Sequence, residues 1–370
     1  MSSRFHTAIA TLLVGLLAAG CAAGTSSPGG SASAPNASPS GTTAVPSGAG
    51  PSGEPSTEPT DPAEGELFPL TVGLGFTPNV QFAPFYLAES AGYYRDAGLD
   101  VTLQNKIDPD LVPLIGQGAI DIGLADGTSV IPAVSQGIPI TYVGTIYGKF
   151  PSIVFAKASS GIRKPADLKG KRIGIPGRYG SSWVMLQALL SSAGLTPDDV
   201  EIVEYPDFGQ GAAVAAGAVD AATGFANNEP VQLELSGTPA TVLHVDDIVP
   251  LPGNGLITGN ATLDAKHDVL AAFVEATLRA MDDIAANPQV GLDAAYQAVP
   301  ELATTPDIQR AVLEATIDVW KGAAQQTGGY GAIDPAAWTT SIDFMSGLGL
   351  VPEPVTADQM LDTSLLPSGG

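Results

Sequence analysis

The side chains best suited to recognise a small molecule stand in four short segments. Each segment mixes rings, amides, hydroxyls or charges that can contact the face and the polar edge of an organic compound. Arg178 can also neutralise an anion or stack on a ring. The sequence therefore predicts a binding site built from Phe76, Asn79, Gln81 and Phe82; Asp126, Gly127 and Thr128; Arg178, Tyr179, Ser181 and Ser182; and Asn227, Asn228 and Glu229.

Several of these residues also have an ordinary structural interpretation. Phe76 and Phe82 are equally compatible with a hydrophobic core. Asn79 and Asp126 can cap helices, and so can Asp121, for which capping is the interpretation we favour. The sequence leaves these alternatives open.

Catalytic and metal-binding patterns are missing from the sequence. Cys21 is the single cysteine, and His244 and His267 are the histidines beyond the N-terminal segment, so the sequence offers no disulfide and no convincing metal cluster. GxSxG, Walker and GxGxxG motifs are also missing. Glu229 is then interpreted as a ligand contact in its NNEP setting or as a solvated loop residue. We expect a binding protein that is not an enzyme and needs no cofactor or metal.

The candidate segments follow strands in an alternating pattern of strands and helices. Apolar, β-rich stretches (PLTVGLGF, DVTLQ, GAIDIGLAD, PITYVGTIY and KRIGIP) alternate with helical spacing at residues 81–99, 129–136 and 183–195. Strands joined by helical crossovers predict parallel sheets covered on both faces, with ligands at the strand ends. Ser181 or Ser182 can cap the helix after KRIGIP, which would direct its positive end at a ligand.

A weak internal repeat indicates two copies of this architecture. GAIDIGLADGTS and GAVDAATGFANN share their pattern, with Asp121 aligned to Asp220. The pattern from Leu263 onward is helical, at residues 263–287, 291–298, 306–321 and 335–347. We predict an α/β fold of two lobes: residues 66–155 form lobe 1, residues 156–254 form lobe 2, and residues 255–370 return to lobe 1 and form a helical C-terminal tail.

The composition excludes nucleic acid as a partner. The 370 residues contain 15 Lys and Arg against 38 Asp and Glu, a formal charge of −23, and binding to phosphate backbones relies on basic residues. We interpret the acidity as an aid to solubility.

The N-terminus predicts secretion and a lipid anchor. Residues 8–19 form an apolar stretch too short to span a bilayer, and LLAAGC resembles a bacterial lipobox whose cysteine, here Cys21, is lipidated. Ala18 departs from the Leu that is usual three residues before the cysteine, and a free cysteine in an ordinary signal peptide is the alternative. Residues 22–65, rich in Ser, Gly and Pro, predict a disordered linker about 35 Å in span. These features indicate an extracytoplasmic protein anchored to the outer face of the cell membrane.

The stretch LGFTPNVQFAPFYLAESAGYYRDAGLDV resembles the solute-binding proteins for thiamine pyrimidine precursors, riboflavin, nitrate and alkanesulfonates. TPN, GYY-x-x-x-GLDV and GQGAIDIG carry the resemblance, which covers residues 69–261 well and the tail more loosely. It implies a two-lobed type II periplasmic-binding fold, a monomer, and an ABC permease with its ATPase as partners. PNVQFAP, FANNEP and LPGNGL are closer to the riboflavin-binding branch, and Phe76 stands where the pyrimidine-precursor branch has a stacking aromatic.

The resemblance favours capture of a planar nitrogen heterocycle, either riboflavin-like or a thiamine pyrimidine precursor. The alternatives are a sulfonate or nitrate type of anion, a sensory lipoprotein, and an enzyme like the pyrimidine synthases of this fold. Those synthases carry a cysteine-rich segment and a histidine, whereas this chain has Phe82 where a related motif has His.

Overall fold

The computed structural model describes residues 67–105 and 108–367. The chain divides into two units, residues 1–59 and 60–370, and all described residues belong to the second unit. The predicted signal, Cys21 and the linker at residues 22–65 lie outside the described residues.

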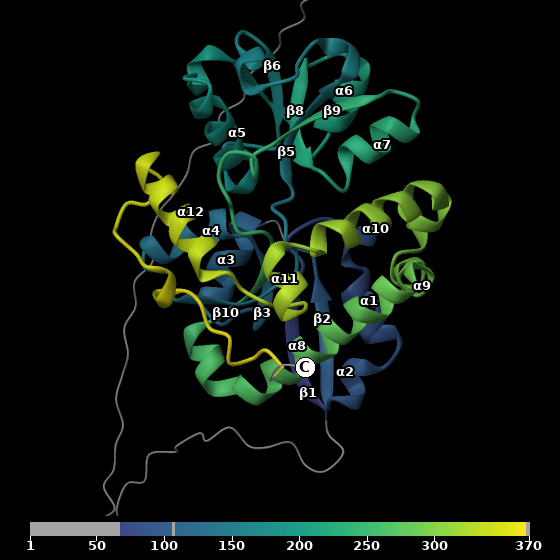
Figure 1. Cartoon of the computed structure of the whole chain (residues 1–370). Coiled ribbons are helices and arrows are strands. Elements are labelled where there is room, and N and C mark those ends of the chain that lie inside the picture. Colours follow the sequence, from purple (N-terminus) through teal and green to yellow (C-terminus); the bar gives the residue numbers. More distant parts are fainter. Residues whose placement is uncertain (1–66, 106–107, 368–370) are drawn as a thin grey trace, which may run out of the picture. The chain divides into compact units, whose positions relative to one another are not determined.

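Two five-stranded sheets form the centres of two lobes (Figure 1). Lobe 1 has the strand order β2-β1-β3-β10-β4, and lobe 2 has the order β7-β6-β8-β5-β9. The strands are β1 (Phe68–Gly73), β2 (Leu99–Gln104), β3 (Ile122–Ala125), β4 (Ile140–Thr145), β5 (Ser152–Lys157), β6 (Arg172–Ile175), β7 (Glu201–Glu204), β8 (Ala221–Phe225), β9 (Ala240–His244) and β10 (Gly255–Gly259).

The expectation of parallel sheets is wrong for one strand of each lobe. β10 is antiparallel to β3 and β4, and β5 is antiparallel to β8 and β9. Both strands enter their sheet directly from the other lobe, so no crossover within one sheet sets their direction. Since β5 already belongs to the sheet of lobe 2, this sheet begins a few residues before position 155, the expected end of lobe 1.

The internal repeat occupies equivalent places in the two sheets. Asp121 precedes β3, and its Oδ2 accepts a 2.8 Å hydrogen bond from the backbone N–H of Thr71 in β1. Asp220 precedes β8, and its Oδ2 accepts a 2.9 Å bond from the N–H of Arg172 in β6. The N–H of each aspartate donates in return to the carbonyl of the same partner. Helix capping by Asp121 is therefore wrong, because this side chain joins two strands.

The helices cover the sheets, and the predicted helical tail is present as α8 to α12 (Figure 1). The helices are α1 (Ala83–Ser90), α2 (Tyr93–Asp96), α3 (Asp108–Gly116), α4 (Gly127–Ser135), α5 (Gly180–Ser192), α6 (Gln210–Ala216), α7 (Glu229–Leu235), α8 (Asn260–Ala286), α9 (Pro288–Ala298), α10 (Pro306–Trp320), α11 (Ala323–Gly328) and α12 (Pro335–Gly347). Short 3₁₀ turns are η1 (Val80–Phe82), η2 (Ala158–Ser160), η3 (Pro165–Leu168), η4 (Pro197–Asp199), η5 (Pro300–Thr304) and η6 (Ala357–Gln359).

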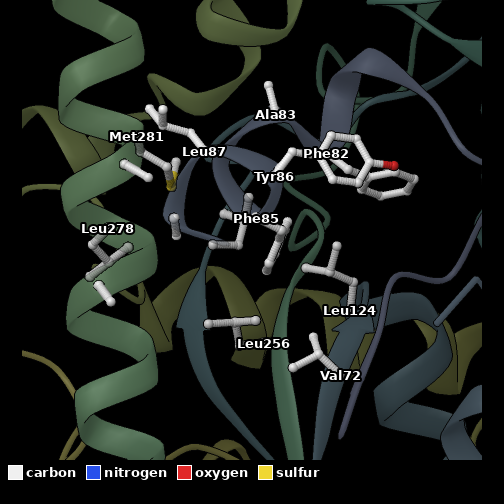
Figure 2. Close-up of a cluster of buried hydrophobic side chains, with 14 of the residues drawn as sticks. Val72, Phe82, Ala83, Phe85, Tyr86, Leu87, Leu124, Leu256, Leu278 and Met281 are labelled. Atoms are coloured by element: carbon white, nitrogen blue, oxygen red, sulfur yellow. The ribbon is translucent and has the colours of Figure 1, made fainter. Parts of the chain in front are cut away.

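The core of lobe 1 packs the first sheet against α1 and α8. α8 buries Leu270, Phe273, Thr277 and Met281 at the three- and four-residue spacing of one helix face. Figure 2 shows Met281 and Leu278 of α8 with the cluster that includes Phe85 and Leu256. Fully burying a side chain of this size stabilises the fold by about 1.5–3 kcal/mol. This packing makes lobe 1 a firm base for the loops at the ends of its strands.

Candidate ligand-binding site

A pocket with an empty volume of about 1010 Å³, partly open to solvent, lies between the two lobes. Segments after β1, β3 and β4 line it from lobe 1, and segments after β6, β7 and β8 line it from lobe 2. The carboxyl ends of the strands are where open α/β sheets bind ligands. The pocket floor continues into the core, because Phe82, Phe85 and Leu124 belong to both (Figure 2).

Most of the predicted contact residues line this pocket, although they come from segments far apart in the chain. Phe82 is 3% exposed, belongs to the core of lobe 1 and also lines the pocket, so its contact with a ligand stays a prediction. The predicted residues that line the pocket are Phe76, Gln81, Phe82, Asp126, Tyr179, Ser181, Ser182, Asn228 and Glu229.

Asn79, Gly127 and Thr128 stand beside the pocket without lining it. The Oδ1 of Asn79 accepts a 3.0 Å bond from the N–H of Gln81, so this amide caps η1. Gly127 donates its N–H to the carbonyl of Pro252, and Thr128 is hydrogen-bonded to Asp126. These three residues hold the loops that carry the predicted contact residues.

Asn227 and Arg178 point elsewhere. Asn227 is completely buried, and its Nδ2 donates to the Thr316 hydroxyl of α10 at 2.9 Å, which ties lobe 2 to the helical tail. Arg178 is half-exposed, forms a 3.3 Å ion pair with Glu204, and lies over the ring of Trp183. The sequence placed both residues in a ligand-facing segment, but the described pocket is not lined by either.

One carboxyl group from each lobe reaches the pocket. Asp126 is 2% exposed and caps α4. Its Oδ1 accepts hydrogen bonds from the backbone N–H groups of Thr128, at 2.8 Å, and Ser129, at 3.2 Å. Burial raises the pKa of Asp126, while the bonds from Thr128 and Ser129 and the Ser181 hydroxyl of lobe 2 oppose the rise. The Asp126 carboxyl and the first turn of α5 therefore line the same pocket.

Glu229 is the corresponding group of lobe 2. Its Oε2 accepts a 2.8 Å bond from the N–H of Phe225, the last residue of β8. Burial raises the pKa of Glu229, and this backbone bond lowers it in part. Glu229 is the first residue of α7 and is half-buried, and its contact with a ligand stays a prediction.

The rings of Phe76 and Phe208, one from each lobe, both line the pocket and contact each other. Their centroids are 4.9 Å apart and the ring planes are inclined at 84°, an edge-to-face contact. Phe208 has φ of +59°, the single positive φ of a non-glycine residue in the described part of the chain. Residues held in such conformations cluster at ligand sites. The segment that carries Phe208 is thus a functional candidate on backbone geometry alone.

Several lining residues were not found from the sequence. Phe208 and Gln210 follow β7, a short strand with exposed ends that the hydrophobic pattern did not reveal, although EIVEY followed by PDFG carries a strand and turn signal. Asn254 lies in LPGNGL, and Tyr147 donates its hydroxyl to Gln81 Oε1 at 2.9 Å. The full set of such residues is Leu74, Gly75, Phe85, Leu124, Ile146, Tyr147, Pro176, Gly180, Phe208, Gln210, Gly224, Phe225 and Asn254.

Comparison with known sequences assigns the family. The sequence model described as NMT1/THI5 like matches residues 79–290, more than half of the chain, from the η1 loop to α9. The chain belongs to the NMT1/THI5-like family. This confirms the resemblance inferred from the sequence motifs.

Relatives in the NMT1/THI5-like family include binding proteins and enzymes. The riboflavin-binding protein RibY of Chloroflexus aurantiacus is 34% identical over 86% of this chain and 92% of its own length. A 4-amino-5-hydroxymethyl-2-methylpyrimidine phosphate synthase of Legionella pneumophila is 26% identical over 64% and 75%. The formylaminopyrimidine-binding protein of Halalkalibacterium halodurans is 28% identical over 78% and 88%.

A solved structure shows the same fold. The alkanesulfonate-binding protein SsuA of Xanthomonas axonopodis pv. citri, bound to MOPS, superposes with a TM-score of 0.63 at 21% identity, over 80% of this chain and 99% of that protein. The fold is thus the predicted two-lobed type II periplasmic-binding fold with a helical C-terminal region. Within the described residues, no helix has the length and apolar run needed to cross a membrane. No cluster of three His, Cys, Asp or Glu side chains suited to a metal ion occurs in residues 67–105 and 108–367.

Proposed function

We propose that this protein is an extracytoplasmic solute-binding lipoprotein that captures riboflavin, or a closely related planar nitrogen heterocycle, for an ABC importer. The observation that carries the proposal is the pocket between the lobes, in which aromatic rings from both lobes surround amide and carboxyl groups. The relative with 34% identity over most of both chains, named a riboflavin-binding protein, supports the choice of ligand.

The lining suits a ring system with a polar edge. Phe76 and Phe208 offer ring faces and edges at one side, and the apolar floor includes Phe82 and Phe85. Pockets of this kind gain affinity from the apolar surface that they bury, and a few polar groups orient the ligand. In our proposal Asn228 and the other amides of the pocket bond to ring nitrogens and carbonyls.

Binding studies on the purified full chain test the ligand. We expect one-to-one binding of riboflavin, measured by calorimetry and by quenching of flavin fluorescence, with the pyrimidine precursors of thiamine, taurine and nitrate as competitors. A yellow colour or a co-purified compound identified by mass spectrometry would support the same conclusion. Binding of taurine or nitrate alone would overturn the heterocycle proposal.

The synthase relative makes an enzyme the second candidate function. We infer a binding role because the relatives named as binding proteins match larger shares of this chain. Mass spectrometry of the bound compound after prolonged incubation tests this choice. Recovery of unchanged ligand agrees with capture, whereas conversion to a new product would contradict it.

The proposed setting is a monomer tethered through lipidated Cys21 and its linker, which delivers ligand to a permease and its ATPase. The lipobox-like LLAAGC and the linker composition support the anchor. The Cys21→Ser variant should leave the membrane fraction and appear in the soluble fraction. Unchanged fractionation would contradict lipidation, independently of the ligand.

A further inference from the structure

The charge and hydrogen-bonding character of the pocket differ from those of a site for anions. Among the described residues that line it, none is Lys or Arg, and two are the carboxylic acids Asp126 and Glu229. Arg178 stands next to lining residues, yet it is engaged by Glu204 and Trp183. Within residues 67–105 and 108–367, no cationic side chain therefore lines the pocket to neutralise a phosphate, sulfonate or carboxylate on a ligand.

The two carboxyl groups also accept hydrogen bonds from backbone N–H groups at the ends of the strands. Asp126 accepts the N–H groups of Thr128 and Ser129, which form the start of α4, and Glu229 accepts the N–H of Phe225. A helix start is a ready anion site only while its N–H groups are free. At these positions the carboxyl oxygens of the chain itself already occupy the N–H donors.

The first turn of α5 is the remaining place where an anion could bind. Gly180, Ser181 and Ser182 line the pocket, and the N-terminus of α5 has no side-chain cap. Asp126 lines the same pocket, and the Ser181 hydroxyl opposes in part the rise that burial causes in the pKa of Asp126. An anionic group bound at this turn would share the pocket with Asp126. Charges of the same sign repel strongly in a partly desolvated site.

The pocket contains buried acceptors that still need donors. Gln210 is 1% exposed, and its Oε1 has no hydrogen-bond partner among the described residues. Asn254 Oδ1 is a second acceptor of this kind. Leaving buried acceptors unsatisfied is costly, so a ligand that brings N–H or O–H groups gains more than one that brings acceptors alone.

We propose that this pocket selects uncharged, hydrogen-bond-donating ligands and rejects their phosphorylated forms, and that Asp126 and Glu229 set this selectivity. The inference rests on the proposed function and makes it narrower: the pocket takes free riboflavin and not its phosphate ester FMN. The phosphate adds a charge of about −1.5 to −2 at neutral pH.

The ratio of the two dissociation constants tests the inference. Flavin fluorescence titrations of the full chain should give FMN a dissociation constant at least about 30-fold higher than that of riboflavin. In Glu229→Gln and in Asp126→Asn this ratio should fall at least about fivefold, because each change replaces a carboxyl group, which can carry a negative charge, with a neutral amide. A loss of affinity that is common to both ligands cancels in the ratio.

Glu275→Gln supplies the matched control, since Glu275 is an exposed carboxyl of α8 that does not line the pocket. Its ratio should stay within about twofold of the unsubstituted chain. Equal affinity for FMN and riboflavin, or an unchanged ratio in both pocket variants, overturns the selectivity while leaving riboflavin capture intact. Binding of neither flavin overturns the proposed ligand and the selectivity together. If a pocket variant fails to fold in a thermal melt, the ratio of the unsubstituted chain decides.

Discussion

The two lobes share one strand order, but their equivalent aspartates have different surroundings. In lobe 1 the Oδ1 of Asp121 binds Lys266 Nζ of α8 at 2.7 Å, and the two side chains are 14% and 30% exposed. In lobe 2 Asp220 pairs with Arg172 of the neighbouring strand, and both side chains are more than a third exposed. The ion pair of Asp121 therefore fastens the helical tail to lobe 1. The ion pair of Asp220 joins only two segments of the lobe 2 sheet.

The kink in α8 is part of this difference. Lys266 has non-helical backbone angles within α8, and its Nζ also lies 5.3 Å from the centre of the Phe68 ring. Asp121, Lys266 and Phe68 thus connect β1, β3 and the tail at one point. In lobe 2 the Arg172 guanidinium instead reaches the carbonyls of Ala218 and Gly217.

The lobes also bring their phenylalanines to the pocket by opposite means. Gly75 directly precedes Phe76 and has a φ of +75°, so the left-handed backbone conformation in this loop falls on a glycine. In lobe 2 Phe208 itself has φ of +59°, and the glycine follows as Gly209 with φ of −77°. Backbone strain in lobe 1 is thus avoided by a glycine, whereas in lobe 2 it is placed on the ring-bearing residue.

We expect the largest difference in stability between equivalent variants of the two lobes at Asp121 and Asp220. Asp121→Ala should lower the free energy of unfolding by about 3 kcal/mol, because it leaves the N–H of Thr71 and the partly buried Lys266 without a partner. Asp220→Ala should cost about 1 kcal/mol, since water replaces an exposed pair. Urea denaturation of both variants gives the comparison. Equal losses would show that the tail gains nothing from Asp121.

The glycines beside the two phenylalanines give the next largest effect. Gly75→Ala should cost about 2 kcal/mol, because alanine resists a left-handed φ and its Cβ would lie 3.1 Å from the carbonyl oxygen of Leu124. Gly209→Ala should cost less than about 0.5 kcal/mol, since φ there is ordinary and the nearest atom belongs to the Asp207 carboxylate. Thermal melts of the pair measure the difference, and a Gly209→Ala loss as large as that of Gly75→Ala would contradict the assignment of strain.

The sequence predicted the fold through features that depend on local order. Helical spacing from Leu263 onward and the alignment of Asp121 with Asp220 require only neighbours along the chain, and both have counterparts in the structure. The direction of β5 and β10 could not be predicted in this way, because it depends on the lobe from which each strand arrives. β7 was missed because its outward-facing glutamates hide the apolar alternation.

The candidate site shows the same limit at the level of single residues. Asn227 and Asn228 are adjacent, yet the first bonds to Thr316 of α10 and the second lines the pocket. A turn directs successive side chains to different sides, and the spacing alone does not reveal which one faces a ligand. Phe208 was missed for a related reason, since its importance comes from its φ and from Phe76, which lies far away in the sequence.

A third test isolates the strain at Phe208 from the loss of its ring. Phe208→Gly and Phe208→Ala both remove the ring, but glycine accepts the left-handed φ, so Phe208→Gly should be more stable by about 1 kcal/mol. Phe76 has no positive φ, so Phe76→Gly should instead be less stable than Phe76→Ala by about 0.5–1 kcal/mol. Denaturant melts of the four variants give the stability difference between the glycine and alanine variants at each position. If glycine were more stable than alanine at both positions, or less stable at both, the proposed difference in backbone strain between the lobes would be wrong.

The smallest effect concerns the pH dependence of the lobe 2 aspartate. The hydrogen bonds from the Arg172 guanidinium and its backbone N–H hold the pKa of Asp220 below its usual value. A carboxyl with a lowered folded pKa stabilises the protein above its unfolded pKa, and this contribution disappears as the pH falls through the folded pKa. The difference in unfolding free energy between the unsubstituted chain and Asp220→Asn should therefore be constant near neutral pH and shrink in acid. Because the pair is largely exposed, added salt should reduce the difference as well. If Asp220 acted only through its shape in the strand bond, which an amide could reproduce, Asp220→Asn would show no difference even at neutral pH. A difference that persists at low pH and high salt would contradict the charge as its source.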